Sequence, residues 1–208
     1  MINLRALLFL LRQGRSLQAT GKLGDFAILK AEALGAKADP AIAAQLAPVV
    51  GYYPPIDLEQ LHQLPPGSFG YEYAHHMLTN QLQPFNVSPE LATVAQRNVF
   101  ALRYAVTHDI FHVLLGFDTS YAGEMGVLAF AAAQGYSPLQ RISLAIAGVL
   151  YPLLAGGQRQ QIAANRRRGW ALGQQATFLL SERFEEKWAL PLSQVRQEFN
   201  LPDPAIAG

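Results

Sequence analysis

The chain has 208 residues, of which 50% are hydrophobic and only 15% are charged, and its mean hydropathy is +0.11. Ordinary globular domains carry about 25% charged residues, so this composition excludes a disordered chain and indicates a deep core, a lipid-lined cavity or a membrane-facing patch. The net charge of +1 is too small to indicate a nucleic-acid partner. Because the chain has no cysteine, a disulfide framework and a thiolate zinc site are excluded as well.

The spacing of apolar residues is helical almost throughout, and alternating strand patterns are missing. We therefore predict an all-α fold, a single-domain helical bundle over residues 1–208 with an apolar cavity; one domain is the default at this length. The Pro- and Gly-rich connector 54–67 is expected to be extended, with a short turn over 57–62. The predicted helices, in chain order, cover Ile2 to Gln13, Leu17 to Leu34, Pro40 to Val50, Gly70 to Leu82, Pro89 to Leu115, Tyr121 to Gln134, Pro138 to Leu154, Gln158 to Phe184 with a break near Gly169, and Leu192 to Phe199.

Two basic segments and one uncharged segment fit either a membrane surface or an ordinary protein surface. If the first helix is regular, Arg5, Arg12 and Arg15 form a basic stripe beside apolar residues, which suits a membrane or packing against the body or a second subunit. The run Arg166 to Arg168 could reach lipid headgroups, although such a run is usually a solvated face. The longest uncharged stretch, Ile142 to Gln158, has 17 residues and is interrupted by Pro and Gly. It therefore predicts a buried or membrane-touching helix.

Four potential metal ligands gather around the end of the predicted helix 89–115. His108 and His112 are four residues apart, so their imidazoles lie one above the other, and Asp109 flanks the same helix surface. This helix is expected to stop at Gly116, and a short connection then leads into an antiparallel helix whose Glu124 can face the two histidines. A carboxylate on an apolar helix face is costly unless a metal, a charge or a donor compensates it. His108, Asp109, His112 and Glu124 are therefore the candidate metal ligands.

Other interpretations of these residues stay open. The His and Asp side chains could form a solvated polar stripe, although Tyr104, Phe111 and Leu115 share much of that face. A zincin protease helix carries Glu where Asp109 stands, and a His-Asp phosphohydrolase needs a separate upstream His and a distant downstream Asp. If a divalent metal is bound, two imidazoles with one or two carboxylates favour Zn or Fe(II), with Mn or Mg as alternatives.

The sequence around these ligands resembles a known family. His108-Asp109-x-x-His112, with Glu124 twelve residues further on, is similar to the metal signature of the coenzyme Q biosynthesis protein 4 family. The similarity covers most of the chain from about Leu64 onward, and the metal signature is its most specific part. Further similar segments are Leu64 to Gly70 with Tyr73 and Met77, His112 to Gly116, Phe184 to Trp188, and Val195 with Arg196.

The resemblance implies a helical, dimeric protein of quinone biosynthesis that is attached peripherally to a membrane. It implies that the four residues matching the family's proposed site hold the metal, and that the substrates are polyprenylated aromatic ring intermediates. The family is implicated in oxidative removal of the ring carboxyl at C1 and in organising other quinone-biosynthesis enzymes. The chain departs from the family pattern at His76, where an aromatic or apolar residue is expected, and it shows no mitochondrial targeting extension. We therefore expect a bacterial member that is cytoplasmic and peripherally membrane-associated.

Two hypotheses about function follow. In the first, the protein is an enzyme whose metal binds the ring of a prenylated substrate, while apolar helices house the isoprenoid tail. In the second, it is a non-catalytic scaffold that presents a prenylated quinone precursor or another isoprenoid lipid to partner enzymes. The stretch Met125 to Leu154, whose only charge is Arg141, is predicted to form the wall of a tail tunnel. His62, His75 and His76 lack chelate spacing and are expected to be ordinary histidines.

Overall fold

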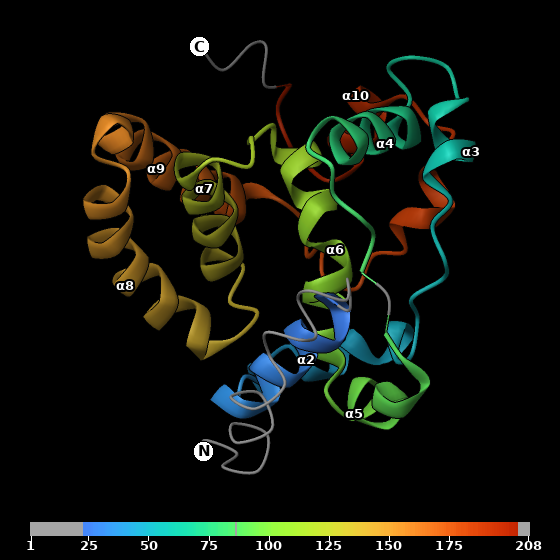
Figure 1. The fold of residues 1–208 in the computed structure, drawn as a ribbon, viewed down its shortest axis with the longest axis horizontal. Helices are drawn as coiled ribbons and strands as arrows, with labels where there is room; N and C mark the ends of the chain where they lie inside the picture. Colours follow the sequence, from blue (N-terminus) through green and yellow to red (C-terminus); the bar gives the residue numbers. More distant parts are fainter. Residues whose placement is uncertain (1–22, 86, 204–208) are drawn as a thin grey trace.

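The computed structural model describes residues 23–85 and 87–203, and this part of the chain contains helices and no β-strand (Figure 1). The all-α prediction is therefore confirmed. The predicted helix 2–13, with its basic stripe of Arg5, Arg12 and Arg15, lies outside the described residues, and the single domain over 1–208 stays a prediction. The α-helices are α2 (Leu23–Leu34), α3 (Leu58–His62), α4 (Phe69–Thr79), α5 (Ala92–Arg97), α6 (Val99–Leu115), α7 (Tyr121–Ala133), α8 (Pro138–Leu154), α9 (Arg159–Gln175) and α10 (Leu192–Glu198), and short 3-10 helices cover Ala43–Val49, Pro89–Leu91, Gly156–Gln158 and Phe184–Lys187.

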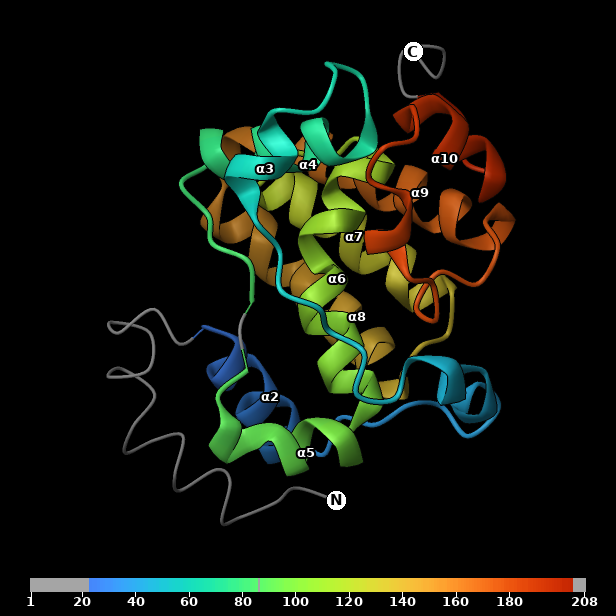
Figure 2. The same cartoon turned by 90° about the vertical axis from the view of Figure 1, so that its right-hand side faces the viewer.

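Helix α6 runs through the middle of the molecule, and the other helices surround it (Figures 1 and 2). Helices α7, α8 and α9 lie on one side, α3, α4 and α10 lie on the other, and α2 and α5 pack against α6. Phe111 of α6 is fully buried, and its ring centroid lies 5.6 Å from that of Phe130 in α7 and 6.1 Å from that of Phe184. This aromatic core joins the C-terminal segment to α6 and α7.

The predicted helix 89–115 is divided at Asn98 into α5 and α6. Asn98 has a non-helical backbone (φ −109°, ψ 71°), and its side-chain oxygen accepts a hydrogen bond from the backbone nitrogen of Ala101. Its amide nitrogen donates to the Glu32 carboxylate and to the carbonyl oxygen of Ala36, both at 2.8 Å. Asn98 therefore caps α6 and attaches it to the end of α2, which the apolar periodicity does not reveal.

Helix α9 is continuous from Arg159 to Gln175, so the break predicted near Gly169 is wrong. The helix also ends at Gln175 and not at the predicted Phe184. A Cβ atom at Gly169 would overlap the backbone oxygen of Gly126 in α7, and one at Gly173 would lie 2.6 Å from the backbone oxygen of Phe130. These glycines let the backbones of α7 and α9 approach closely. Gly169 therefore serves helix packing and does not interrupt the helix.

The two helices in the stretch Met125 to Leu154, which is predicted to form the wall of a tail tunnel, differ in their exposure. Most of α7 is buried, whereas α8 exposes large apolar side chains along its outer side. No described helix is long and apolar enough to cross a membrane alone, and α8 and α9 reach that length and composition only as a pair bent by 114°. We call the exposed apolar side of α8 the α8 outer face; it consists of Ile142, Ile146, Val149, Leu150, Leu153 and Leu154.

Candidate metal centre

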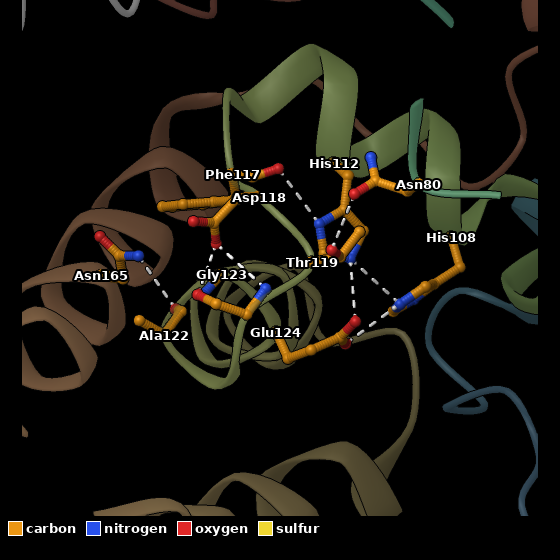
Figure 3. Close-up of polar contacts among 11 residues, drawn as sticks. Asn80, His108, His112, Phe117, Asp118, Thr119, Ala122, Gly123, Glu124 and Asn165 are labelled. Carbon is orange, nitrogen blue, oxygen red and sulfur yellow. Dashed lines mark hydrogen bonds and ion pairs between the residues drawn. The ribbon is translucent and has the colours of Figure 1, made fainter. Parts of the chain in front are cut away.

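A short hairpin between α6 and α7 brings the candidate ligands together. Gly116 ends α6 in the left-handed conformation (φ 65°), which glycine adopts without a steric penalty. Ser120 then caps α7, because its side-chain oxygen accepts a hydrogen bond from the backbone nitrogen of Gly123 at 3.2 Å. The first turn of α7 consequently places Glu124 opposite the histidines of α6 (Figure 3).

The side chains of His108, His112 and Glu124 converge between α6 and α7, and we call them the ligand cluster (Figure 3). The Nε2 atoms of the two histidines are 3.3 Å apart, and each lies 3.3 Å from a carboxylate oxygen of Glu124. One ligand atom from each residue lies within 4.8 Å of the others. His112 is buried, whereas the side chains of His108 and Glu124 are 24% and 36% exposed. The cluster is therefore compact and accessible from one side.

A hydrogen bond on the far side of His112 fixes which nitrogen faces the cluster. Nδ1 of His112 lies 3.2 Å from the backbone oxygen of Phe117, and a carbonyl oxygen can only accept. Nδ1 therefore carries the proton, and in the neutral ring Nε2 directs its lone pair toward Glu124 and His108. This is the usual arrangement of a metal-binding histidine, whose second nitrogen donates to a carbonyl or carboxylate.

Glu124 and His112 stabilise one another's charge. Burial on its own raises the pKa of Glu124, but hydrogen bonds and charges from His108 and His112 hold that pKa well below its usual value. Burial opposes the protonation of His112, yet Glu124 and, more weakly, Asp109 raise the pKa of His112 above its usual value. The carboxylate is thus ionised at neutral pH and available to a cation.

Asp109, the fourth predicted ligand, is not part of the ligand cluster in this structure. It is half-buried, and burial raises its pKa although the neighbouring charges of His108 and His112 lower it. Its own charge helps to raise the pKa of Tyr73 in α4, where burial is the larger cause. Asp109 thus lies near both the cluster and α4, and its role as a ligand stays a prediction.

Two arginines from the C-terminal helices form hydrogen bonds with the end of α6, in the residues that follow His112. Arg196 of α10 and Arg168 of α9 donate to backbone carbonyl oxygens in the last turn of the helix. Carbonyl groups in the last turn of a helix lack the regular hydrogen bond to a residue four positions on and carry partial negative charge, so a guanidinium group stabilises them. Val113, one of the acceptors, also accepts a longer bond of 3.4 Å from the backbone nitrogen of Gly116. The sequence shows Arg168 only as part of a basic run, and this role was missed. The acceptors are Val113 and Leu114 for Arg196, both at 2.9 Å, and Leu115 and Gly116 for Arg168, at 2.7 and 3.4 Å.

An apolar cavity of about 340 Å³ adjoins the ligand cluster through His108. It lies between α2, α6, α7 and the beginning of α8, and only Leu128, Leu139, Gln140 and Ser143 of the stretch 125–154 line it. A larger hollow of about 680 Å³ shares Ala36 and Phe100 with this cavity. The predicted cavity is therefore present, but helices α2 and α6 form much more of its wall than the sequence suggested.

His76 of α4 lies against the other side of the ligand cluster. Its ring stacks on His112 with a centroid distance of 5.8 Å, and its buried Nε2 has no hydrogen-bond partner among the described residues. Burial, with a smaller effect of the charge on His112, lowers the pKa of His76 to about 4. His76 and His112 also line a pocket of about 290 Å³ with Asn80 and Arg196. Helical spacing could not reveal this neighbour, because it comes from a different helix.

These features define an all-α protein with a candidate divalent-metal site in a helical hairpin, beside an apolar cavity. The profile of the family described as coenzyme Q (ubiquinone) biosynthesis protein Coq4 matches residues 53–205. The chain is 32% identical over 160 residues to the mitochondrial ubiquinone biosynthesis protein COQ4 homolog of Bos taurus, and 32% identical over 161 residues to that of Homo sapiens. The chain belongs to the Coq4 family, as its motifs predicted.

The two alignments cover 73% of this chain and 57% of each relative, so the chain spans somewhat more than half the length of the curated relatives it matches. The fold is also similar to a crystal structure of a candidate ubiquinone biosynthesis protein from Nostoc punctiforme, with a TM-score of 0.68 over 98% of this chain and 100% of the other. Because these two chains are only 22% identical, this likeness establishes the fold alone.

Proposed function

We propose that the protein acts in ubiquinone biosynthesis, as the names of its relatives indicate, by binding a polyprenylated aromatic intermediate beside a divalent metal. The observation that carries the proposal is the position of the ligand cluster next to an apolar cavity that includes His108 in its wall. In this proposal His108, His112 and Glu124 hold the metal, and Asp109 supplies a fourth ligand. Zn or Fe is favoured by the donor set, with Mn or Mg as alternatives.

The residues present fit such a metal. Two imidazole nitrogens and one ionised carboxylate converge within 4.8 Å, and the hydrogen bond from His112 to Phe117 presents the unprotonated nitrogen to the cluster. A bound iron would supply redox chemistry, whereas a bound Zn would polarise the carboxyl or a ring oxygen. The partial exposure of His108 and Glu124 leaves the site open to a ligand from one side.

The cavity and the hollow next to it suit the isoprenoid tail of such a ligand. The cavity is lined mainly by aliphatic and aromatic side chains, so burying a tail there removes apolar surface from water. The neighbouring hollow extends the space past Ala36 and Phe100. His108 lies where the cavity meets the cluster, so a tail in the cavity leaves the ring beside the ligands. We infer that the helices hold the tail while the cluster orients the ring.

The proposed reaction is oxidative decarboxylation of the ring at C1. The bond between C1 and the carboxyl breaks, the carboxyl leaves as CO₂, and a hydroxyl takes its place. One oxygen atom of dioxygen enters this hydroxyl and the other leaves as water, with two electrons and two protons supplied by an external donor of the reduced nicotinamide or flavin class. The alternative is a non-catalytic scaffold that uses the same site to hold a prenylated precursor and presents it to other quinone-biosynthesis enzymes.

Metal analysis of the purified full chain tests the site. We expect about one divalent metal ion per chain in the wild type and a loss of most of it in His112→Ala. The matched control is His75→Ala, which removes an exposed histidine from α4 and should leave the metal content unchanged. Equal metal content in wild type and His112→Ala would refute the metal site. Stoichiometric Fe or Mn would favour the enzyme, and Mg or weak occupancy would favour the scaffold.

We also propose that the protein lies peripherally on a membrane through the α8 outer face. This face is apolar and exposed, with Val149 and Leu153 each 68% exposed, and no acidic residue occurs between Glu124 and Glu182. Arg159, Arg166 and Arg167 line a hollow of about 560 Å³ between α8 and α9, where they can meet anionic headgroups. A homodimer and contacts with other quinone-biosynthesis enzymes are proposed from the family resemblance alone.

A further inference from the structure

Gln140, in the first turn of α8, is a buried polar side chain whose amide has no partner at full hydrogen-bond distance in the described part of the chain. The residue is only 5% exposed, and the polar group nearest to its amide is the hydroxyl of Tyr104, whose pKa the amide helps to lower against the larger effect of burial. Its backbone nitrogen donates a hydrogen bond to the carbonyl oxygen of Ser137 at 3.0 Å, so the main chain of Gln140 is satisfied by the helix turn. The helix turn gives no such partner to the side-chain amide. A buried amide without partners destabilises the protein that carries it.

The place of Gln140 in the fold suggests what its amide is for. Gln140 lines the 340 Å³ cavity together with His108 of the ligand cluster, and its side chain lies beside the hydroxyl of Tyr104, which lines the same cavity. Tyr104 is in turn one helical turn before His108, and the two rings are 5.7 Å apart. Ser143 and the exposed Lys30 are the other polar residues around a cavity that is otherwise apolar. A few convergent polar groups in an apolar pocket usually orient a ligand.

We propose that Gln140 determines ring specificity: its amide forms hydrogen bonds with an oxygen substituent on the aromatic ring of a prenylated ligand. The amide nitrogen can donate to a ring hydroxyl, carbonyl or carboxyl oxygen, and the amide oxygen can accept from a ring hydroxyl. The inference rests on the proposed function, since it requires a prenylated aromatic ligand in the cavity. It adds a residue that the metal signature does not contain.

The proposal has a specific energetic consequence. A prenylated ring without oxygen would fill the cavity and leave the amide still without a partner, so it gains no hydrogen bond there. A ring with a suitably placed oxygen forms a hydrogen bond with the amide, and binding then removes the free-energy cost of a buried amide without a partner. Sites that use a buried polar group in this way discriminate strongly against ligands that lack the matching group. We therefore expect a preference of at least about tenfold for the oxygenated ring.

Two probes with the same tail isolate the contribution of the ring. One is a 4-hydroxybenzoic acid that carries a farnesyl chain, and the other is farnesylbenzene. Their dissociation constants are measured with the metal-loaded full chain for the wild type, for Gln140→Leu and for Gln160→Leu. Leu has a size similar to Gln and no hydrogen-bonding group, and Gln160→Leu serves as the matched control because it makes the same substitution at an exposed position of α9, outside the cavity. Thermal unfolding is followed for all three proteins without ligand.

The expected result combines weaker recognition with unchanged or higher stability. Gln140→Leu should bind the hydroxybenzoate probe about tenfold more weakly, should bind farnesylbenzene as well as the wild type does, and should unfold at the same or a higher temperature because a buried amide without partners is gone. Gln160→Leu should change both dissociation constants by less than about twofold. A gain in stability together with a loss of ring recognition is typical of a ligand-binding residue and not of a structural one.

Three outcomes would overturn the inference. If Gln140→Leu unfolds at a lower temperature and binds both probes equally less well, the amide is structural, for example satisfied by an internal water. If neither dissociation constant changes, Gln140 does not recognise the ring, and the proposed function is unaffected. If the wild type binds neither probe while its metal content is stoichiometric, the prenylated-ligand part of the proposed function fails together with this inference.

Discussion

Helices α7 and α8 follow one another in the chain and each carries a single charged residue, Glu124 in α7 and Arg141 in α8, yet they meet very different surroundings. Helix α7 is enclosed by α6, α8 and α9, and its one acid faces the two histidines. Helix α8 packs with one side only and leaves its outer face uncovered. The comparison teaches that apolar composition alone does not distinguish a core helix from a helix that presents an apolar surface.

The sharpest test of this difference truncates one apolar side chain on each helix. Phe130→Ala in α7 removes a fully buried ring that packs on Phe111, and we expect the free energy of unfolding to fall by about 3–5 kcal/mol. Val149→Ala on the α8 outer face should change it by less than about 0.5 kcal/mol, because that side chain is already in solvent. Urea unfolding measures both values. A loss of more than about 1 kcal/mol in Val149→Ala would mean that another part of the protein covers this face.

The ligand cluster gives the next largest effect. A ligand that binds only the folded state stabilises it by about 2.7 kcal/mol at 100 times its dissociation constant and by about 4.1 kcal/mol at 1,000 times. We expect a chelator to lower the melting temperature of the metal-loaded wild type accordingly and to leave Glu124→Gln unchanged, since the amide no longer supplies an anionic ligand. An equal effect of the chelator on both proteins would place the stabilising metal elsewhere.

The local part of the site was predictable from the sequence, and the long-range part was not. His108 and His112 are separated by one helical turn, and the connection after Gly116 is short enough to bring Glu124 back, so spacing alone brings these side chains together. His76 and Gln140 reach the same region from α4 and α8. Their positions depend on how whole helices pack, which no local pattern encodes.

The same distinction explains two of the errors in the predicted helices, the missed division at Asn98 and the break expected near Gly169. Asn98 divides a continuous apolar pattern because its amide finds partners on α2, and Gly169 leaves α9 intact because it faces Gly126 across a close helix crossing. The prediction at both positions used only the local apolar pattern and the average helix propensity of the residue. In both cases a contact with another helix decided whether the helix is interrupted. The helices with an uninterrupted apolar pattern and clear ends, such as α7 and α8, were predicted almost to the residue.

Neighbouring arginines of α9 extend the comparison to single side chains. Arg168 donates to the carbonyl oxygens of Leu115 and Gly116, whereas Arg167 is exposed beside the α8–α9 hollow. We expect Arg168→Met to lower the free energy of unfolding by about 1.5–3 kcal/mol, as for hydrogen bonds that involve a charged group. Arg167→Met should stay within about 0.5 kcal/mol of the wild type. Urea unfolding compares the two, and equal losses would contradict the assignment of Arg168 to the end of α6.

The smallest expected effect concerns the membrane. A basic residue near an anionic surface contributes about 1 kcal/mol, which corresponds to about a fivefold change in binding. We expect Arg166→Gln and Arg167→Gln each to weaken binding to phosphatidylglycerol vesicles by about that factor in a flotation assay, and to have little effect on neutral phosphatidylcholine vesicles. Arg97→Gln removes the same charge from α5, where Arg97 pairs with Glu32, and should bind like the wild type. If Arg97→Gln weakened binding equally, net charge would be the cause and the α8–α9 surface would have no special role. If the wild type bound neither vesicle, the α8 outer face would not be a membrane contact.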